Sequence, residues 1–204
     1  MSSPIPVSAR AEQEARNGHK AAVVWLTGLP GSGKTTLAFA VCTALQESGM
    51  QAVVLDGDKL RDGLCADLGF SVQDRLENMR RVGEVAKLFM MQGTVALVAL
   101  VSPVRSARDR ISASLSDGDF YEVYCSSPLE VCKARDPKGM YAKAEKGLIA
   151  DFTGVSAPYE APLAPALTVN TGSEPVHTSV QGLLAFLRPR LALLPRGAIH
   201  IENN

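Results

Sequence analysis

The sequence predicts an α/β fold, a three-layer α/β/α sandwich around a parallel central sheet, and three observations support this prediction. Short apolar runs alternate along the chain with longer stretches whose apolar residues recur at helical spacing. The run TVALVALV (94–101) is apolar on both faces, which suits a central parallel strand covered by helices. The segment GLPGSGKTT (28–36) lies between a predicted strand and a predicted helix, where a phosphate-binding loop is expected. The fold is therefore expected to be of the P-loop NTPase and kinase type.

The chain has 204 residues, which is enough for one sizeable core, so we expect one domain. Residues 1–20 are polar and lack periodicity, and they predict a flexible leader or a short docking helix. The P-loop domain is expected to span residues 21–188. Residues 189–204 are expected to form a C-terminal tail outside it.

The first half of the chain predicts three strands with two helices between them. AAVVWLTG (21–28) is the first strand, and the helical stripe of residues 34–49 follows it. QAVVLDGD (51–58) is the second strand, and TVALVALV is the third. The helix between these two strands is expected to bury Leu76, Met79, Val82, Ala86 and Phe89.

The second half continues the alternation, which implies right-handed crossovers and covering helices on the sheet. SPVRSARDRISASL (102–115) predicts a helix, FYEVYC (120–125) a strand and SPLEVCKAR (127–135) a short helix. PALTVN (165–170) is the last expected strand, and EPVHTSVQGLLAFL (174–187) the last expected helix.

A long segment without periodicity interrupts this half of the chain. Residues 136–162 carry several lysines and are punctuated by glycine and proline, and a long irregular segment in a compact domain is usually functional. We interpret them as a lid. The short helix before the lid is expected to have Ser126 or Ser127 near its N-cap and Pro128 at its start.

Charge and cysteine content exclude several classes of function. Lys and Arg number 21 and Asp and Glu 21, which leaves no bulk field for nucleic acid or an anionic membrane. No apolar run is long enough to suggest a signal peptide or a membrane span, so we expect a cytoplasmic protein. The four cysteines are expected to be reduced and mostly buried. Cys65, in an expected loop beside charged residues, is the thiol to test for redox chemistry.

The glycine-rich segment predicts the phosphate-donor site. Its backbone N–H groups would cradle phosphate oxygens, Lys34 would neutralise the transferred phosphate, and the Thr35 hydroxyl would coordinate Mg²⁺. ATP is favoured because no Asn-Lys-x-Asp guanine-reading motif occurs in the chain. The residues predicted to bind ATP are Gly28, Leu29, Pro30, Gly31, Ser32, Gly33, Lys34, Thr35, Thr36 and Arg135.

Two acids at the end of the second strand are expected to complete this site. The third strand ends without the acid that often helps to hold Mg²⁺, so Asp56 and Asp58 are the obvious supply. Ligands gather at the carboxyl ends of parallel strands, which brings both acids to the rim of the phosphate loop. The alternative is that an Asp only caps a helix while its companion is solvated.

Residues after these acids suggest an acceptor pocket for an aromatic anion. Arg61 follows Asp58 by about one helical turn, and Arg75 and Asn78 share a predicted helix face opposite much of the apolar stripe. Phe70 precedes them. A solvated helix face would account for these residues, but a ring, guanidinium groups and an amide also suit an aromatic anion.

The motifs together resemble the adenylyl-sulfate kinase family over about Val23 to Leu187. The resemblance is carried by GLPGSGKTT, LDGDKLRDGL, DLGFSVQDRLENMRRVGEVAKLF, SPVRSARDR, EVYCSSPLEVCKARDPKGMYAKA and DFTGVSAPYEAP, in the family's order and spacing. It implies transfer of phosphate from ATP to the 3′-hydroxyl of adenosine 5′-phosphosulfate (APS), giving 3′-phosphoadenosine 5′-phosphosulfate (PAPS) and ADP. It also suggests a homodimer and a separate ATP sulfurylase that supplies the acceptor.

The resemblance also implies roles for individual residues. Asp58 would act with Mg²⁺ and the 3′-hydroxyl, supported by Lys34 and Asp56 as catalytic residues. The residues implied in acceptor binding are Asp58, Arg61, Phe70, Arg75, Asn78, Ser102, Lys138 and Phe152. Among them, Phe70 and Phe152 would sandwich the adenine, and Lys138 and the lid would close over both nucleotides to exclude water.

Some residues depart from the family pattern or leave alternatives open. Ala142, Glu145 and Ala150 replace residues that are often cationic in family lids, so fewer cations are available for lid closure. Ser102 could carry a phosphate, although pocket lining or helix capping is the preferred interpretation. The three histidines, His19, His177 and His200, are expected on the surface or in a tail, so proton transfer is assigned to Asp58.

Two other functions compete with this interpretation. A P-loop kinase for a sugar, an antibiotic or another nucleotide could share the fold and the donor motif. The chain could also be a weakly catalytic nucleotide-binding partner that regulates or scaffolds a sulfate-activating assembly. The paired phenylalanines argue against a sugar, and intact Lys34, Thr35 and Asp58 argue against the non-enzyme.

Overall fold

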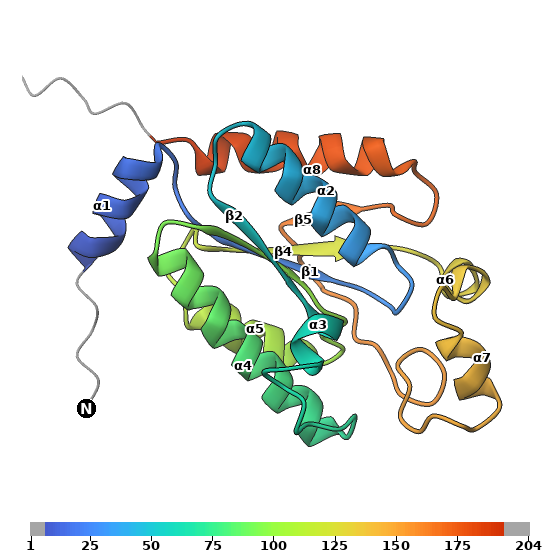
Figure 1. Cartoon of the computed structure of the whole chain (residues 1–204). Helices are drawn as coiled ribbons and strands as arrows, with labels where there is room; N and C mark the ends of the chain where they lie inside the picture. The colour runs from blue at the N-terminus through green and yellow to red at the C-terminus, as the bar shows by residue number, and fades with distance from the viewer. Residues whose placement is uncertain (1–6, 194–204) are drawn as a thin grey trace, which may run out of the picture.

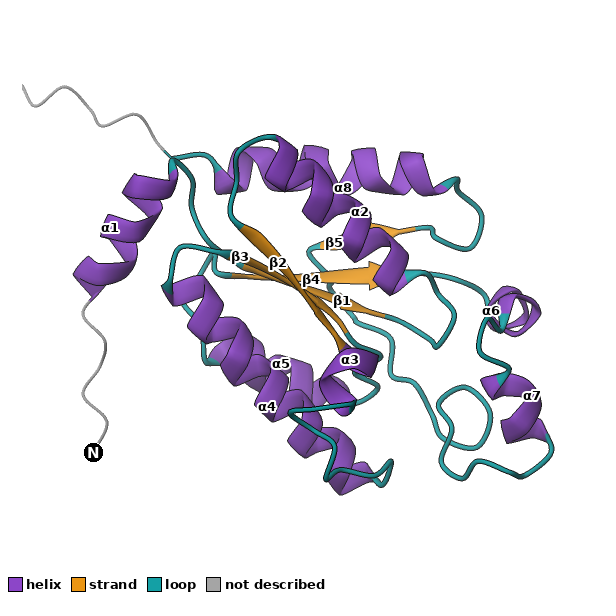
Figure 2. Cartoon of the chain, in the orientation of Figure 1, coloured by secondary structure: helices purple, strands orange, loops and turns teal. Residues whose placement is uncertain are grey.

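The computed structural model describes residues 7–193, and a parallel sheet forms their centre. Five strands pair in the order β2-β3-β1-β4-β5, and helices cover both faces (Figures 1 and 2). The strands are β1 (Val23–Thr27), β2 (Ala52–Asp56), β3 (Val95–Ala99), β4 (Phe120–Cys125) and β5 (Leu167–Val169). The predicted three-layer α/β fold is confirmed. All five predicted strands are present.

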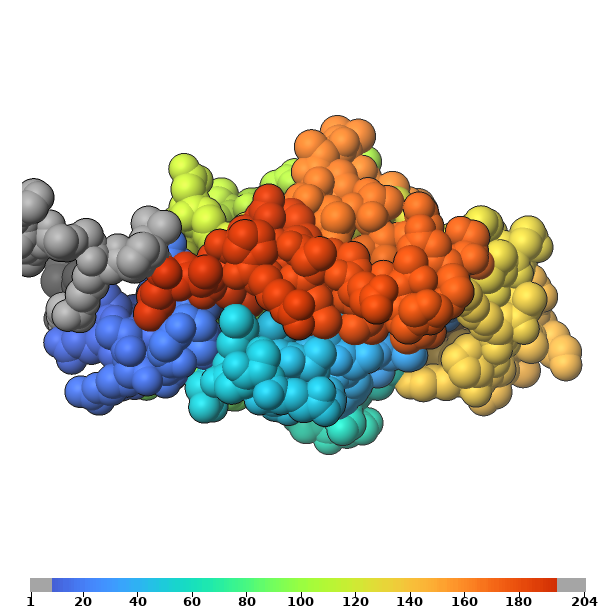
Figure 3. Space-filling model, turned by 90° about the horizontal axis from the view of Figure 1, so that it is seen from above, coloured from blue at the N-terminus to red at the C-terminus, as the bar shows by residue number. Residues whose placement is uncertain are grey.

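The two covering layers follow from the alternation of side chains along the central strands. Val24 and Leu26 of β1 point to the face covered by α2 (Lys34–Glu47) and α8 (Val176–Leu191). Trp25 points to the opposite face, which α4 (Val72–Met91) and α5 (Arg105–Ala113) cover. Every residue of β1 and of β3 is buried, as expected for parallel strands between two helical layers. Seen from above, α2 and α8 run side by side over their face (Figure 3).

Shorter helices extend from this sandwich. The N-terminal helix α1 (Val7–Asn17) lies at the edge near the amino ends of the strands, whereas α3 (Gly57–Arg61) follows β2 directly (Figure 1). The helices α6 (Leu129–Arg135) and α7 (Met140–Glu145) lie beside the carboxyl ends of the strands. No helix in residues 7–193 is both long and apolar enough to cross a membrane.

The sequence allowed either a flexible leader or a short docking helix at the N-terminus, and residues 7–17 form a helix that contacts the domain. Arg10 donates to both carboxylate oxygens of Asp119, at 2.5 and 2.8 Å, and to the carbonyl oxygen of Ala21 at 2.9 Å. Glu14 accepts from the backbone N–H of Ala21 at 2.9 Å. A flexible leader is therefore wrong for residues 7–17, because an ion pair and hydrogen bonds to Ala21 fix the helix to the domain. Residues 1–6 lie outside the described part.

The predicted C-terminal boundary and one histidine also need correction. Pro189 lies inside α8, whose last turn persists because Leu191 is fully buried and its carbonyl oxygen accepts from Lys20 N at 2.8 Å. Residues 194–204, including His200, lie outside the described residues. His19 is 1% exposed rather than on the surface: its Nε2 accepts from Gln51 N at 2.8 Å, while Nδ1 donates to the carbonyl of Lys20. His177 is exposed, as predicted.

The buried face of α4 differs from the predicted stripe at two positions. Phe89 is 37% exposed, and Met90 takes its place in the core at 4% exposure. Asn78 belongs to the buried face beside Met79, at 2% and 1% exposure, so it does not lie opposite the apolar stripe. A polar side chain on a buried face is a stronger indication of a binding role than one on a solvated face.

The lid segment contains a helix and a small core of its own. Tyr141 of α7 and Phe152 pack edge to face, 5.1 Å between ring centroids, over buried Cys132 of α6. The predicted serine cap of α6 is wrong: Pro128 occupies the N-cap, no side chain caps the helix, and the Ser127 hydroxyl is buried without a hydrogen-bond partner. The lid is thus a packed unit, which lies beside the strand ends (Figure 2).

Candidate functional site

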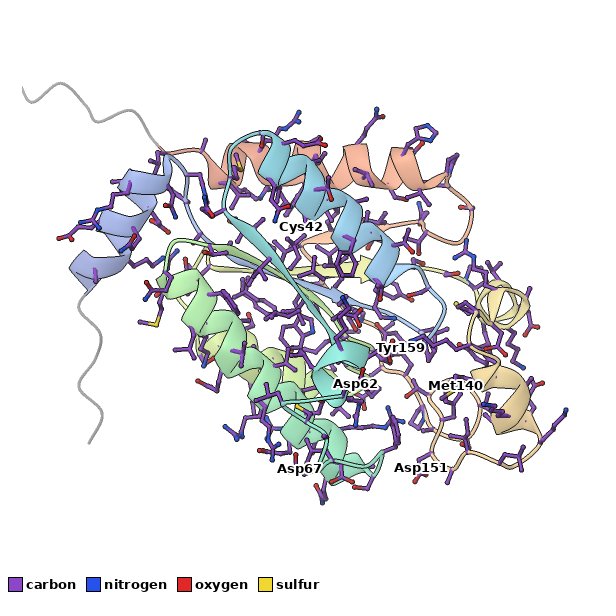
Figure 4. All side chains as sticks on the ribbon, viewed as in Figure 1. Cys42, Asp62, Asp67, Met140, Asp151 and Tyr159 are labelled. Carbon is purple, nitrogen blue, oxygen red and sulfur yellow. The ribbon has the colours of Figure 1, made fainter. Side chains whose placement is uncertain are left out.

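A cavity of about 900 Å³ opens at the carboxyl ends of the strands, between the phosphate loop, α3, α4 and the lid segment. The chain runs from β1 to β2 in one direction across the sheet and from the neighbouring β3 to β4 in the other, an arrangement that typically places a ligand crevice at this end. Met140 and Asp151, labelled in Figure 4, mark the lid side of this region. Its volume lies near the upper end of the range for small-molecule pockets, about 300–1,000 Å³.

Glycines allow the phosphate loop its shape. Gly31 and Gly33 have φ angles of 75° and 88°, in the left-handed region that favours glycine. At Gly28 a side chain would be impossible, because its Cβ would lie 2.6 Å from the carbonyl oxygen of Cys125. The predicted nucleotide residues that line the cavity are Pro30, Gly31, Gly33, Lys34, Thr35, Thr36 and Arg135. Gly28, Leu29 and Ser32 are not among its lining residues.

Lys34 lies beneath this loop and is 7% exposed. Its ammonium donates to the carbonyl oxygens of Gly28 and Leu29, at 3.0 and 2.8 Å. Burial lowers its pKa to about 8, and Cys125 and Cys132, followed by the nearby acids, oppose that shift. The ammonium is therefore held where phosphate oxygens would meet it, and an anionic ligand would favour its charged form.

Asp56 joins the phosphate loop to α3. One carboxylate oxygen accepts the Thr35 hydroxyl at 2.8 Å, and the other accepts the N–H groups of Asp58 and Lys59 at 3.2 and 3.3 Å. Asp56 is thus the N-cap of α3, as the alternative interpretation of this acid pair expected. It also contacts the donor loop, so one buried carboxylate has both structural and donor-site contacts.

Asp58 projects into the open side of the cavity, and its side chain is 69% exposed. It forms an ion pair with Lys138 of the lid segment. The two residues are distant in sequence, and both were predicted to act at the acceptor site. Their contact supports a close approach of the lid to the acid, although an exposed pair by itself contributes little stability.

The predicted acceptor side chains gather around Phe70, which is 49% exposed. The guanidinium carbons of Arg61 and Arg75 lie 4.5 and 5.5 Å from the centre of its ring. Arg75 also donates to the carbonyl oxygens of Phe70 and Asp151, at 2.9 and 2.6 Å, which links α4 to the lid. Burial, followed by the charge of Arg61, lowers the pKa of Arg75. Two cations held this close favour an anionic ligand.

Asn78 lines the same cavity, and its Oδ1 atom is buried without a hydrogen-bond partner. Such groups are rare in native structures because each one forfeits its hydrogen bonds to water. Thr153 has a buried Oγ1 without a partner, next to Phe152 on the lid. Both residues line the cavity and both atoms lack a partner in the fold, and Thr153 was missed because a lone threonine carries no sequence signal.

Ser102 also lines the cavity, but its hydroxyl is already engaged. Its Oγ accepts from Trp25 Nε1 at 2.9 Å and donates to the carbonyl oxygen of Leu100 at 3.2 Å. Helix capping is wrong for this serine, since Val104 is the N-cap of α5. At 1% exposure, a phosphate on Ser102 would have to break both hydrogen bonds, which argues against modification.

The end of the cavity beside Arg135 is lined by residues that sequence reasoning missed. Thr171 and Glu174 follow β5 and line the cavity together with Ser179 of α8, whose buried hydroxyl lacks a partner. Arg135 donates to the carbonyl oxygen of Thr171 at 2.7 Å, which fixes this wall. Thr171 and Glu174 follow the carboxyl end of β5, and this position was the one feature of the sequence that could have indicated a place in the site.

The thiols do not support redox chemistry at this site. All four cysteines are buried, as predicted, and none forms a disulfide. Cys65 is fully buried instead of lying in an open loop, and burial raises its pKa against the effect of Arg81. The burial of Cys65 agrees with the expected reduced, buried thiols and argues against redox chemistry there, because a protonated and inaccessible thiol reacts slowly.

A phosphate-binding loop and a separate cationic pocket that open into one cavity of a parallel α/β sandwich define a P-loop kinase for a small anionic acceptor. The family model for adenylylsulphate kinase matches residues 20–170, and the chain belongs to this family. The adenylyl-sulfate kinase of Acaryochloris marina is 48% identical over 189 residues, which cover 93% of this chain and 92% of that protein.

Solved structures support the same assignment. The Mycobacterium tuberculosis APS kinase CysC in complex with AMPPNP and APS has a TM-score of 0.78 and 44% sequence identity, with coverage of 82% of this chain and 98% of that chain. A gluconokinase from Sinorhizobium meliloti is only 18% identical, with a TM-score of 0.53 over 82% of this chain and 91% of that one. The second likeness shows the fold alone, so the acceptor must be argued from the site.

Proposed function

We propose that this protein transfers the γ-phosphoryl group of ATP to the 3′-hydroxyl of APS, giving PAPS and ADP. The observation that carries the proposal is the acceptor end of the cavity. Arg61 and Arg75 flank exposed Phe70, and the unpartnered Oδ1 of Asn78 lies in the same lining. A planar ring, two guanidinium groups and a free amide oxygen suit an adenine nucleotide that carries an anionic group.

The donor half of the reaction is assigned to the phosphate loop. Its backbone N–H groups and Lys34 would hold the phosphates of ATP, and Arg135 would lie at the nucleotide end of the cavity. Lys34 would exchange its contacts with the carbonyls of Gly28 and Leu29 for phosphate oxygens. Since phosphoryl transfer depends mainly on position and charge, a fixed ammonium would stabilise the negative charge of the transferred group.

Asp58 would accept the proton of the 3′-hydroxyl. Its carboxylate is exposed to the cavity and forms an ion pair with Lys138. When the acceptor binds, this ion pair must break, or Lys138 must contact both Asp58 and the acceptor. Lys138 would then be free to contact a phosphate oxygen as the lid closes. The lid lacks cations at Ala142, Glu145 and Ala150, so closure would depend on Lys138 and on the Arg75 contact with Asp151.

The acceptor would be held on both sides. Phe70 and Phe152 would enclose the adenine, with Arg61, Arg75 and Asn78 on the ribose and phosphosulfate side. Ser102 would contribute a wall of the pocket and no direct chemistry, because its hydroxyl is already hydrogen-bonded twice.

A magnesium ion is the expected cofactor. The Thr35 hydroxyl and the Asp56 carboxylate, 2.8 Å apart beside the phosphate loop, form an oxygen-rich corner that suits Mg²⁺, which usually keeps several waters in nucleotide sites. Thr35 with Asp56, and Asp58 from the acceptor side, would hold the ion. When bound, Mg²⁺ neutralises phosphate charge; no set of three or more His, Cys, Asp or Glu in residues 7–193 forms a separate metal site.

Acceptor choice tests the function most directly. ADP release should be measured with APS, adenosine 5′-monophosphate and gluconate at equal concentrations. A clear preference for APS is the expected result, and equal or better turnover of gluconate or the monophosphate would refute the proposed acceptor. Binding of both ATP and APS without turnover would instead support the non-enzyme alternative.

Three wider assignments stay predictions. We propose a homodimer, which light scattering of the purified protein would test. We also propose that a separate ATP sulfurylase supplies the acceptor, which a coupled assay from sulfate and ATP would test. The expected cytoplasmic location can be checked by fractionation of the source cells.

A further inference from the structure

A buried arginine behind the acceptor pocket has no part in the functions assigned so far. Arg108 of α5 is 1% exposed and does not line the cavity. Its Nε donates to Glu122 of β4 at 2.5 Å, which neutralises its charge. A buried guanidinium is costly unless every donor direction is used, so its remaining contacts indicate what it holds.

The two outer nitrogens of Arg108 bond to separate walls of the acceptor pocket. Nη1 donates to the carbonyl oxygen of Ser102 at 2.6 Å, and Nη2 donates to the carbonyl oxygen of Glu160 at 2.8 Å. Ser102 lines the cavity, and Glu160 lies on the chain segment that returns from Phe152. The backbone N–H of Glu160 also donates to the carbonyl oxygen of Pro103 at 2.9 Å. One guanidinium group therefore binds both segments where they meet.

The backbone at Ser102 needs such support. Its φ angle is 48°, in a left-handed conformation that costs a non-glycine residue about 1–2 kcal/mol, and the proline that follows disfavours helical geometry further. Arg108 fixes the carbonyl of this residue, and Trp25 fixes its hydroxyl. Without the arginine, the strained segment would lose its strongest hydrogen bond.

We propose that Arg108 is a positioning residue for the acceptor: its guanidinium holds the Ser102 wall and the returning arm of Phe152 in one arrangement before the acceptor binds. The inference rests on the proposed function, since it takes this end of the cavity as the APS pocket. Lysine cannot replace arginine here, because a single ammonium cannot reach both carbonyl oxygens in the planar geometry of the fork. The hydrogen bonds of Arg108 go to Glu122, Ser102 and Glu160 and none goes to the phosphate loop, so ATP binding is expected to be independent of it.

The central test compares Michaelis constants in Arg108→Lys and in the wild-type protein. The substitution keeps a positive charge beside Glu122 and removes at least one carbonyl bond, so the KM for APS should rise about tenfold or more. The KM for ATP should stay within about twofold. A parallel rise of both constants, or no rise for APS, overturns the proposal.

A fluorescence measurement follows the same wall without turnover. Trp25 is the one tryptophan of the chain, and its Nε1 donates to Ser102. Its emission should shift in Arg108→Lys, whereas Arg105→Lys, on the same helix, should leave it unchanged. Arg105 bonds through its side chain to the carbonyl oxygen of Ala161 and not to Ser102. Identical spectra for wild type and Arg108→Lys contradict the proposal.

Two further variants separate positioning from general stability, even if Arg108→Lys folds poorly. Glu122→Gln removes the negative charge that pairs with Arg108 but still allows Arg108 to bond to both carbonyl oxygens. Arg10→Ala removes the ion pair that holds α1 near the amino ends of the strands, away from the acceptor pocket. Both should lower the melting temperature and keep the KM for APS within about twofold. A rise of that KM in proportion to lost stability would overturn the inference. If the wild-type protein does not turn over APS, the proposed function is refuted. If the wild type turns over APS and Arg108→Lys keeps the wild-type KM for APS, only the role of Arg108 is refuted.

Discussion

Replacement of Asn78 by leucine should stabilise the empty protein and weaken acceptor binding. The Oδ1 atom of Asn78 is buried without a partner, on a helix face whose neighbours Met79 and Val82 are apolar and buried. A polar atom kept in this state stabilises nothing in the folded chain, so its retention points to a ligand. Leucine is similar in size, is apolar and is a better helix former, so it removes the cost and the ligand contact together.

The magnitude follows from the state of this one atom. A buried acceptor without a hydrogen bond costs about 1–3 kcal/mol, and removal of that cost should raise the unfolding free energy by about 2 kcal/mol. For a domain of this size, that corresponds to a rise of roughly 4–8 °C in melting temperature. Loss of a hydrogen bond to the acceptor should raise the KM for APS by about 10- to 100-fold.

Thermal unfolding with and without APS, together with ADP release, tests both effects. Ser179→Ala is the matched control, because it also removes a buried, unpartnered polar atom from a helix in the cavity wall, but at the nucleotide end. It should not weaken APS binding. An Asn78→Leu variant that melts below the wild type while keeping its KM for APS would show that the amide has a partner in the fold and no ligand role.

Three further predictions follow from other contacts. Asp58→Asn should lower kcat by about 10²- to 10⁴-fold with little change in the KM for ATP, measured by ADP release; an unchanged kcat would remove Asp58 from catalysis. Because burial holds the pKa of Lys34 at about 8 against an ordinary 10.5, the folded state binds fewer protons than the unfolded state between these values. The free energy of unfolding of the nucleotide-free wild type, relative to Lys34→Met, should therefore rise by about 2 kcal/mol between about pH 7 and about pH 9.5. Urea unfolding measures this difference, and a decrease over that range would contradict a pKa lowered by burial. Arg10→Ala should cost about 1–3 kcal/mol, since it leaves the mostly buried Asp119 carboxylate unpaired, without affecting either KM; equal unfolding curves would show that α1 does not contribute.

The layers of the fold were predictable because they depend on local patterns. Val95–Ala99 is apolar throughout, Val23–Thr27 is apolar up to its last residue, and both strands are buried throughout. The loop motif fixes where α2 begins. Helix ends were less predictable when a distant contact decided them. The last turn of α8 continues past Pro189 because Leu191 enters the core and binds Lys20, and no local pattern contains that information.

The candidate site residues were predicted mainly from motifs, whereas their surroundings could not be predicted in this way. The sequence placed Asn78 on an outer face because helical spacing relates it to Arg75, yet the helix turns this amide inward beside Met79. Cys65 was placed in a loop beside charged residues, and the sequence did not show that its side chain is fully buried. Spacing defines neighbours along a helix, but burial depends on what packs against that helix from elsewhere in the chain.

The segment from Asp56 to Asp58 shows how one backbone turn separates two roles. Asp56 is the last residue of β2 and the N-cap of α3, so its carboxylate points back to its own helix and to Thr35. Asp58 lies in the first helical turn, where its carboxylate is exposed to the cavity. Gly57 between them must be small, because a Cβ there would lie 2.5 Å from the Leu100 side chain and 3.2 Å from the carbonyl oxygen of Ala99. The close approach of α3 to the end of β3 therefore favours glycine, because any Cβ would displace the Leu100 side chain and press on the carbonyl of Ala99. This turn places Asp56 against the phosphate loop and leaves Asp58 exposed on the side proposed for the acceptor.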